Sequence, residues 1–191
     1  QRQMCIRDRY SSVSIADGDT AQQAVEELYR HGHRRIAALI SRPDDQSISQ
    51  LRYEGYIQAL ESHGIPVDPE LVICTGGFGA KDAYRAVQEK MAENVDFTAL
   101  FAIADSMAIG AMRALMDAGR RIPEDCSVIA IDGLELSAYI EPPLTTLCQP
   151  MEEMGRRSAE ILLDMVRHKG SHACELLPTT LRQGRSVAAP G

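Results

Sequence analysis

The sequence predicts an α/β fold built on a doubly wound parallel sheet, and two patterns carry this prediction. Short apolar runs, such as residues 36–40 and 99–103, alternate with longer segments whose apolar residues recur at helical spacing. Strands that are apolar on both faces occur where helices cover both sides of a parallel sheet. With 191 residues, of which 45% are hydrophobic, the chain can bury a core of this kind.

The expected elements are bounded by turn and capping residues. The first helix is expected to stop at Gly32 and the second at Gly64, because glycine adopts the left-handed conformation that ends many helices. Asp105 is expected to cap the N-terminus of a later helix. Strands are expected at residues 12–15, 36–40, 71–74, 99–103, 127–131 and 179–182, with an extended crossover at 144–147. Helices are expected at residues 20–31, 49–63, 81–91, 106–118 and 151–167.

Charge and cysteine usage exclude several classes of protein. Lys and Arg total 20 against 27 Asp and Glu, so the net charge of -7 opposes the phosphate contacts that dominate nucleic-acid binding. No apolar run is long enough to cross a bilayer and no secretion signal is visible, so a cytoplasmic protein without membrane contact is expected. The five cysteines are scattered without metal-ligand spacing, which predicts buried thiols and no metal site.

The sequence also lacks the motifs of common enzymes. It contains no GxSxG, P-loop, HExxH or helix-opening GxGxxG motif, so no catalytic residue and no cofactor is expected. The glycine-rich loop at residues 76–79 lacks the Lys-Ser/Thr pair of a P-loop, and we interpret it as a flexible loop. These observations favour a binding module over an enzyme.

A set of side chains suited to a polyol remains. Ligands of doubly wound sheets bind at the carboxyl ends of the strands, and Asp132 follows directly on the expected strand 127–131. Its carboxylate accepts hydroxyl protons, Arg52 offers a planar fork of donors, Phe78 offers a flat apolar face, and Gln149 both donates and accepts. Each residue alone also fits a structural role on a helix surface, in a turn or in the core.

Five segments occur in one order at the intervals of a known family: RHGHRRIAALI, LRYEGYIQAL, ALFAIADSMAIGAMRAL, RRIPEDCSVIAIDG and YIEPPLTTLCQP. Together, over residues 12–187, they resemble the LacI-type bacterial transcription regulators. The resemblance implies a periplasmic-binding-protein-like fold of two lobes that hold a sugar or related small metabolite between them. Effector binding would change the lobe arrangement and so the DNA affinity of a separate N-terminal helix-turn-helix headpiece, which this sequence lacks.

The resemblance also implies a set of site residues and an oligomeric state. Residue by residue, it assigns the effector site to Arg52, Phe78, Asp132, Gln149, Asp17 and Asp105. One departure concerns Ala104, which stands where many sugar-responsive members have a polar side chain, so the effector's identity stays open. The resemblance further implies a homodimer for the full-length protein, with operator DNA bound only through the headpiece.

On this resemblance the chain is a fragment with unequal parts. Residues 35–149 and 179–187 are expected to form the C-terminal, effector-binding lobe, whereas residues 12–34 and 150–178 are expected to be remnants of an N-terminal lobe. Residues 1–11 show no apolar periodicity and are expected to be extraneous or disordered. Remnants of a lobe would expose apolar faces, so we expect the isolated chain to be poorly stable or prone to aggregation.

Two other functions stay open from the sequence. A sugar-binding protein of a transport system would share the fold and the ligand site, and only a secretion signal or a helix-turn-helix upstream would separate it from a regulator. A sugar hydrolase would need paired carboxylates that act as acid and base, and Asp105 and Asp132 are the pair that strand ends could bring together. Because Asp105 is explained as a helix cap, binding without turnover is the preferred interpretation.

Overall fold

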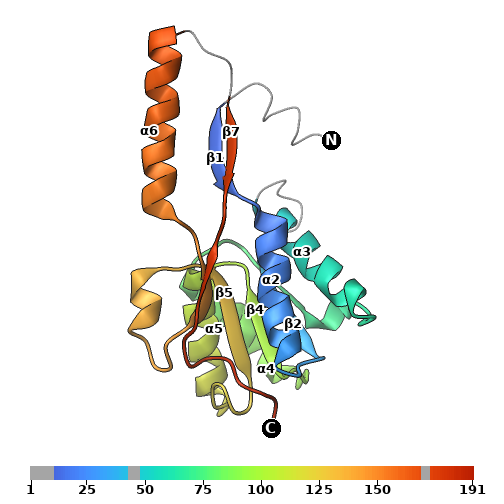
Figure 1. The fold of residues 1–191 in the computed structure, drawn as a ribbon. Coiled ribbons are helices and arrows are strands. Elements are labelled where there is room, and N and C mark those ends of the chain that lie inside the picture. The colour runs from blue at the N-terminus through green and yellow to red at the C-terminus, as the bar shows by residue number, and fades with distance from the viewer. Residues whose placement is uncertain (1–10, 43–47, 169–172) are drawn as a thin grey trace. The chain divides into compact units, whose positions relative to one another are not determined.

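The computed structural model describes residues 11–42, 48–168 and 173–191, and the chain divides into two compact units (Figure 1). Unit 1 comprises Gln1–Ala16 and Gln149–Thr180, and unit 2 comprises Asp17–Cys148 and Leu181–Gly191. The expected segment 1–11 falls almost wholly outside the described residues. No helix in the described part of the chain is long and apolar enough to cross a membrane.

Unit 2 is built on a six-stranded sheet in the order β3-β2-β4-β5-β6-β8. Its first five strands are paired in parallel, which confirms the predicted doubly wound sheet. The chain order reverses between β2 and β4, the point at which sheets of this kind bind ligands. The strands are β2 (Ile36–Ser41), β3 (Val72–Thr75), β4 (Ala99–Ala102), β5 (Ser127–Asp132), β6 (Thr145–Cys148) and β8 (Thr180–Arg182).

Helices cover both faces of this sheet in two packed pairs. Helix α2 packs on α3, and α4 packs on α5 (Figure 1). All residues of β2 and β4 are buried, because both faces of these central strands lie under helices. The helices are α2 (Asp17–Arg30), α3 (Ile48–Ser62), α4 (Ala80–Ala92) and α5 (Asp105–Asp117), with 3-10 turns η1 (Pro69–Leu71) and η2 (Glu135–Ala138).

Glycines allow each helix pair to approach backbone to backbone. A Cβ atom on Gly55 of α3 would lie 2.2 Å from the carbonyl oxygen of Gly18 in α2. On Gly110 of α5 it would lie 2.0 Å from the carbonyl oxygen of Ala80 in α4. Neither position can carry a larger side chain without moving a helix, so these glycines fix the spacing of the pairs.

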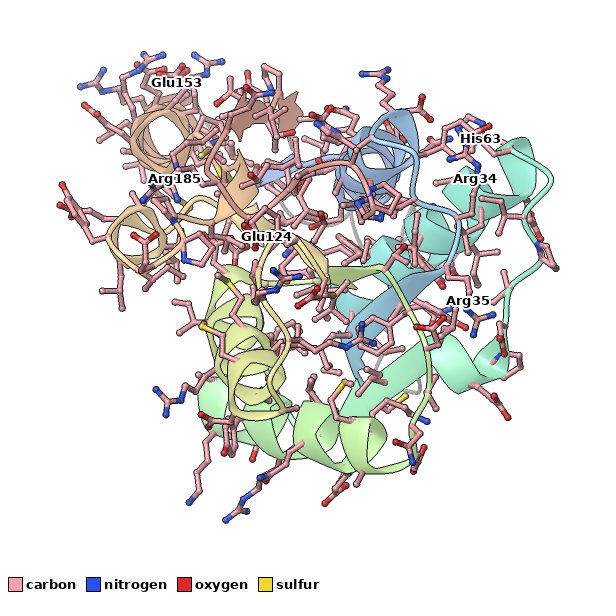
Figure 2. The ribbon with its side chains drawn as sticks, turned by 90° about the horizontal axis from the view of Figure 1, so that it is seen from below. Arg34, Arg35, His63, Glu124, Glu153 and Arg185 are labelled. Carbon is pink, nitrogen blue, oxygen red and sulfur yellow. The ribbon has the colours of Figure 1, made fainter. Side chains whose placement is uncertain are left out.

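Aromatic stacking connects α2 with the C-terminal end of α3. The ring of Tyr29 lies 3.6 Å from that of His63, centroid to centroid, and the Arg34 guanidinium lies 3.8 Å from the Tyr29 ring centroid. Arg34 and His63, both labelled in Figure 2, therefore contact the same tyrosine ring. His63 also bonds through Nε2 to Glu26 Oε2 at 2.5 Å, which joins the two helices again.

Unit 1 consists of a two-stranded sheet and one long helix. Strand β1 (Ser12–Ile15) pairs in parallel with β7 (Cys174–Leu177), and α6 (Met151–His168) packs on β1. Strand β7 was not expected from the sequence. Its four residues alternate between exposed and partly buried, so they lack the continuous apolar run that marks the strands of unit 2.

The structure corrects three further expectations. Segment 144–147 was expected to be a crossover, yet β6 is a full member of the sheet beside β5. Helix α2 was assigned to a remnant of the N-terminal lobe, but it belongs to unit 2, because it packs on α3 and on the central strands. The expected N-cap residue of α5, Asp105, is the first residue of that helix; Ala104 occupies the cap position and makes no side-chain cap bond.

Candidate functional site

The parallel strands bring several expected site residues to one edge of the unit 2 sheet. Strand β5 ends at Asp132, whose register partner on β6 is Cys148, the last residue of that strand. Ile103 and Ala104 follow β4 directly. These positions all lie at the carboxyl ends of the strands, where the doubly wound topology predicts a ligand site.

Arg52 is the centre of this edge. Its side chain is only 3% exposed, and its Nε donates to Asp17 Oδ1 at 2.9 Å. Its Nη1 donates to Asp132 Oδ1 at 3.1 Å and also to the carbonyl oxygen of Ile103. We call Arg52, Asp17 and Asp132 the Arg52 cluster. Three segments far apart in the sequence thus meet on one guanidinium group.

The helix pair α2 and α3 explains how Asp17 reaches Arg52. Gly55 lies one helical turn after Arg52, and Gly18 directly follows Asp17. The close approach of Gly55 to Gly18 therefore holds the first turn of α2 against the middle of α3. Asp17, one of the expected effector-site residues, is the first residue of both α2 and unit 2.

Asp132 has an unusual backbone conformation. Its φ angle is 136°, and Gly133 follows with a φ of 77°. Positive φ at a non-glycine residue is strained and persists where the surroundings over-determine it. Gly133 is packed so closely on β6 that a Cβ atom there would lie 2.5 Å from Cys148 Sγ. The chain therefore turns sharply at the point where it presents the Asp132 carboxylate.

Asp105 lies next to this turn but is fully buried. Its Oδ2 accepts from the backbone N–H of Leu134 at 2.8 Å and from Ser137 Oγ at 2.7 Å, and its Oδ1 accepts from Thr146 Oγ1 at 2.5 Å. Burial raises the pKa of Asp105, and these hydrogen bonds oppose the rise. The carboxylate thus links α5 to the segment after β5 and to β6 instead of capping its own helix.

The remaining expected residues are more peripheral. Phe78 is 39% exposed on the loop between β3 and α4, and its carbonyl oxygen accepts from Ser106 Oγ at 2.7 Å. Gln149 directly follows Cys148 and is the first residue of unit 1 after β6. Ala104 is buried before Asp105 and offers no polar side-chain atom. The structure thus joins Arg52, Asp17 and Asp132 directly.

Sequence reasoning missed several groups that shape the site. The carbonyl oxygen of Ile103 has no sequence signature, because every residue carries the same group. Ser137, Thr146 and Arg182 lie in segments far from Asp105 in sequence and meet it or its partners only in the fold. In the described part of the chain, no group of three or more His, Cys, Asp or Glu residues is arranged to hold a metal ion.

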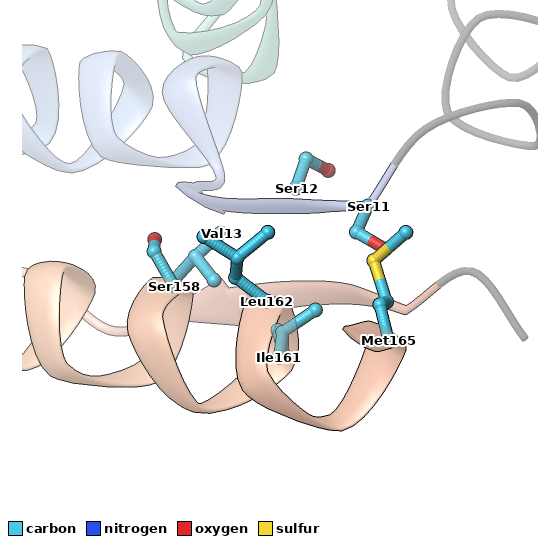
Figure 3. Close-up of a pocket in the computed structure, with 7 residues that line it drawn as sticks. All are labelled: Ser11, Ser12, Val13, Ser158, Ile161, Leu162 and Met165. Atoms are coloured by element: carbon cyan, nitrogen blue, oxygen red, sulfur yellow. The ribbon is translucent and has the colours of Figure 1, made fainter. Parts of the chain in front are cut away.

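A separate cavity lies wholly within unit 1, between β1 and α6 (Figure 3). Its volume is about 350 Å³, and none of the six expected site residues lines it. Val13 faces Ile161 and Leu162 across this space, with serine hydroxyls at its margin. The cavity is an apolar groove without convergent charged groups, in contrast to the Arg52 cluster.

Comparisons with known proteins point to one family. The model of the periplasmic binding protein-like domain matches residues 25–187. The chain is 37% identical over 172 residues to the HTH-type transcriptional repressor CytR of Escherichia coli K12, which covers 87% of this chain and 50% of CytR. The chain spans about half the length of the curated relatives it matches.

Solved structures share the fold, and two of them contain a sugar. One is a complex of the transcriptional regulator CelR with cellobiose, with a TM-score of 0.87 and 34% identity over 94% of this chain and 55% of that one. The other is a LacI family transcriptional regulator from Enterococcus faecium with bound ribose, with a TM-score of 0.83 and 31% identity over 94% of this chain and 66% of that one. All three of these relatives are named as transcription regulators, and none as an enzyme.

Proposed function

Because this chain belongs to the family of periplasmic binding protein-like domains, in the form found in LacI-type transcription regulators, we propose that its Arg52 cluster binds the small-molecule effector of such a regulator. The effector is a neutral polyhydroxylated molecule, of which a sugar is the prime example. In the complete protein, this binding controls the affinity of a helix-turn-helix headpiece for operator DNA.

The observation that carries the proposal is the buried guanidinium of Arg52 between two carboxylates at the ligand-binding edge of the sheet. Arg52 holds Asp17 and Asp132 by bonds that use its Nε and Nη1 atoms. We assign its Nη2 atom to an effector hydroxyl oxygen. The carboxylate of Asp132, partly exposed at its strand end, accepts a hydroxyl proton in return.

The charge of the cluster selects the class of effector. Two carboxylates, Asp17 and Asp132, face one guanidinium, so the cluster carries a net negative charge. A phosphate or carboxylate brought to this edge would meet that charge with little solvent to screen it. Neutral hydroxyls instead satisfy both the acceptors and the donor. The exposed ring of Phe78 supplies an apolar face of the kind that packs on a sugar ring.

The remaining assignments follow from position. Gln149 is proposed as a further polar contact, because it follows directly on Cys148, the register partner of Asp132. Asp105, expected at first to touch the effector, is assigned an indirect role, since its oxygens are occupied by Leu134, Ser137 and Thr146. Ala104 leaves one side of the site apolar and so favours an effector with fewer hydroxyls there.

The burial of Asp105 argues against catalytic turnover of a sugar. Hydrolysis of a glycosidic bond requires two carboxyl groups that both reach the substrate. Asp105 is fully enclosed and bonded on both oxygens, so it cannot act as an acid or base at the bond that Asp132 would face. We infer binding without catalysis, and we further propose that the complete protein is a homodimer, as LacI-type regulators pair their effector domains.

Calorimetric titration with matched ligands tests the proposal. Cellobiose and D-ribose represent neutral sugars, and D-ribose 5-phosphate is the charged counterpart of the second. We expect at least one neutral mono- or disaccharide of a panel headed by these two to bind with measurable heat and D-ribose 5-phosphate not to bind. A chain that binds only the phosphorylated sugar would contradict the proposed effector class, and one that binds no saccharide would contradict the proposed function.

A further inference from the structure

The strained turn after β5 is held from two sides. We call residues 132–137 the Asp132 turn; its first two residues have φ angles of 136° and 77°. From α5, Asp105 accepts the backbone N–H of Leu134 and the hydroxyl of Ser137. The second support comes from β8, on the far side of β6 in the sheet order.

Arg182 provides this second support. Its Nη2 donates to the carbonyl oxygen of Leu134 at 3.0 Å and to Ser137 Oγ at 2.5 Å, and its Nη1 donates to the carbonyl oxygen of Gly133 at 3.4 Å. The Arg182 Nη2 atom also lies 4.0 Å from Asp105 Oδ2. One guanidinium thus binds three acceptors of the same short turn.

Ser137 links the two supports. Its hydroxyl oxygen accepts from Arg182, and the hydroxyl donates toward Asp105 Oδ2 at 2.7 Å, with the carbonyl oxygen of Leu134 as a second acceptor at 2.8 Å. The turn therefore lies between a cation and an anion that are joined through one hydroxyl group. Charge-assisted bonds of this kind are shorter and stronger than neutral ones.

Fold stability alone explains Arg182 poorly. Its Nε atom is buried and has no hydrogen-bond partner among the described residues. A buried donor without a partner is unfavourable, so the Nε atom does not explain why an arginine stands here. The bonds of Arg182 go instead to the carbonyl oxygens that follow Asp132.

We infer that Arg182 is a positioning residue for effector binding, which holds the Asp132 turn so that the Asp132 carboxylate is presented beside Arg52. This inference rests on the proposed function of the Arg52 cluster. Arg182 itself does not touch the effector; it acts through the backbone of Gly133 and Leu134. Loss of the Arg182 side chain leaves the Asp132 carboxylate present, but the backbone at Asp132 is then free to relax from its strained conformation.

The test compares three variants of the full chain. Arg182→Gln removes the positive charge and shortens the side chain. Arg182→Lys keeps the charge but replaces the planar guanidinium, with its several N–H donors, by a single ammonium group. Arg185→Gln is the matched control, because Arg185 (Figure 2) is an arginine three residues further on that pairs with Glu141 at the exposed surface. For each variant, amide hydrogen exchange of residues 133–138, the unfolding midpoint and the Kd for cellobiose and D-ribose are measured.

For Arg182→Gln we expect exchange in residues 133–138 to rise roughly tenfold and the Kd of the bound sugar to rise by about the same factor. Its unfolding midpoint should move by less than about 3 °C. Arg182→Lys should recover part of both effects, and Arg185→Gln should match the wild type. Unchanged exchange in Arg182→Gln, or an unchanged Kd, would overturn the inference. If the wild type binds neither sugar, the proposed function is in doubt, and the exchange measurement alone decides whether Arg182 holds the turn.

Discussion

Arg52 and Asp17 join two helices at the carboxyl edge of the unit 2 sheet, with Nε donating to Oδ1 at 2.9 Å where Gly55 of α3 meets the backbone of Gly18 in α2. The ion pair and the close backbone approach lie one turn apart on α3. The same helix packing that builds the fold therefore sets the position of the donor that we assign to the effector.

Removal of the Arg52 charge is expected to destabilise unit 2. Arg52→Met leaves Asp17, which is buried, and Asp132 without their cation, and breaking a buried ion pair in this way costs about 3–5 kcal/mol. Urea unfolding monitored by circular dichroism measures the loss. The control Arg113→Met removes an exposed ion pair with Asp117 and should leave the transition unchanged. Equal midpoints for both variants would show that the Arg52 cluster does not hold the fold.

Two helix glycines should respond in opposite directions to the same change. Gly110→Ala places a Cβ atom 2.0 Å from the Ala80 carbonyl oxygen and should lower the unfolding midpoint of unit 2 by forcing α4 and α5 apart. Gly155→Ala meets no atom within 4 Å and should stabilise α6 by about 0.5–1 kcal/mol, the helix-propensity difference. Thermal unfolding of the two variants checks both signs. A stabilising Gly110→Ala would mean that the helices are not in backbone contact there.

The free energy of unfolding should decrease in mild acid because His33 is buried in its neutral form. Burial lowers the pKa of His33 below its ordinary value of 6.5, and nearby His31 and Arg34 act in the same direction, whereas the bond from the ring to the carbonyl oxygen of Ala188 opposes the shift. The other ring nitrogen bonds to Thr98 Oγ1. Because the unfolded chain takes up a proton near pH 6.5 while the folded ring stays neutral, this contribution is complete above that pH and is lost as the pH falls through it.

Unfolding midpoints between pH 7.5 and 5.5 measure this effect, for the wild type against two variants. His33→Gln should flatten the dependence on pH, although it also lowers stability at pH 7.5 by breaking the bond to Ala188. His31→Gln, two residues away and more exposed, should keep the wild-type slope. Identical slopes for His33→Gln and the wild type would assign the acid sensitivity to other groups.

Self-association is expected through α6. Val166 is 75% exposed, and Leu162 and Leu163 beside it are also exposed, which makes a contiguous apolar surface on one helix. The double variant Leu163→Glu, Val166→Lys should reduce light scattering and the sedimentation coefficient at high concentration. The control Leu136→Lys removes an exposed leucine from unit 2 and should leave both the light scattering and the sedimentation coefficient unchanged. A wild-type chain that remains monomeric at high concentration would contradict this expectation.

The sequence was most informative where burial is complete. Strands β2, β4 and β5 were recognised because helices cover both of their faces, which leaves an uninterrupted apolar run. Strand β7 was missed because four half-exposed residues carry no such pattern. The place of α2 in unit 2 depends on its contact with α3, which no local pattern reveals.

The candidate site was predictable to a similar extent. The position of Asp132 followed from the rule for strand ends, and the family motifs supplied Arg52 and Asp17 as its partners. The role of Asp105 was not predictable, because a carboxylate before a helix looks like a cap until its bonds to Leu134 and Thr146 are seen. Arg182 carried no signal at all, since the turn that it binds lies 45 residues or more away in sequence.

Calorimetric titration of Asp132→Asn against the wild type tests most directly whether the Asp132 carboxylate accepts an effector hydroxyl beside Arg52. The substitution keeps the size of the side chain but removes its charge and one acceptor oxygen. With the sugar that the wild type binds, we predict a Kd at least about tenfold higher, with an unfolding midpoint within about 3 °C of the wild type. An unchanged Kd in a folded Asp132→Asn variant would contradict the assignment of this edge as the effector site.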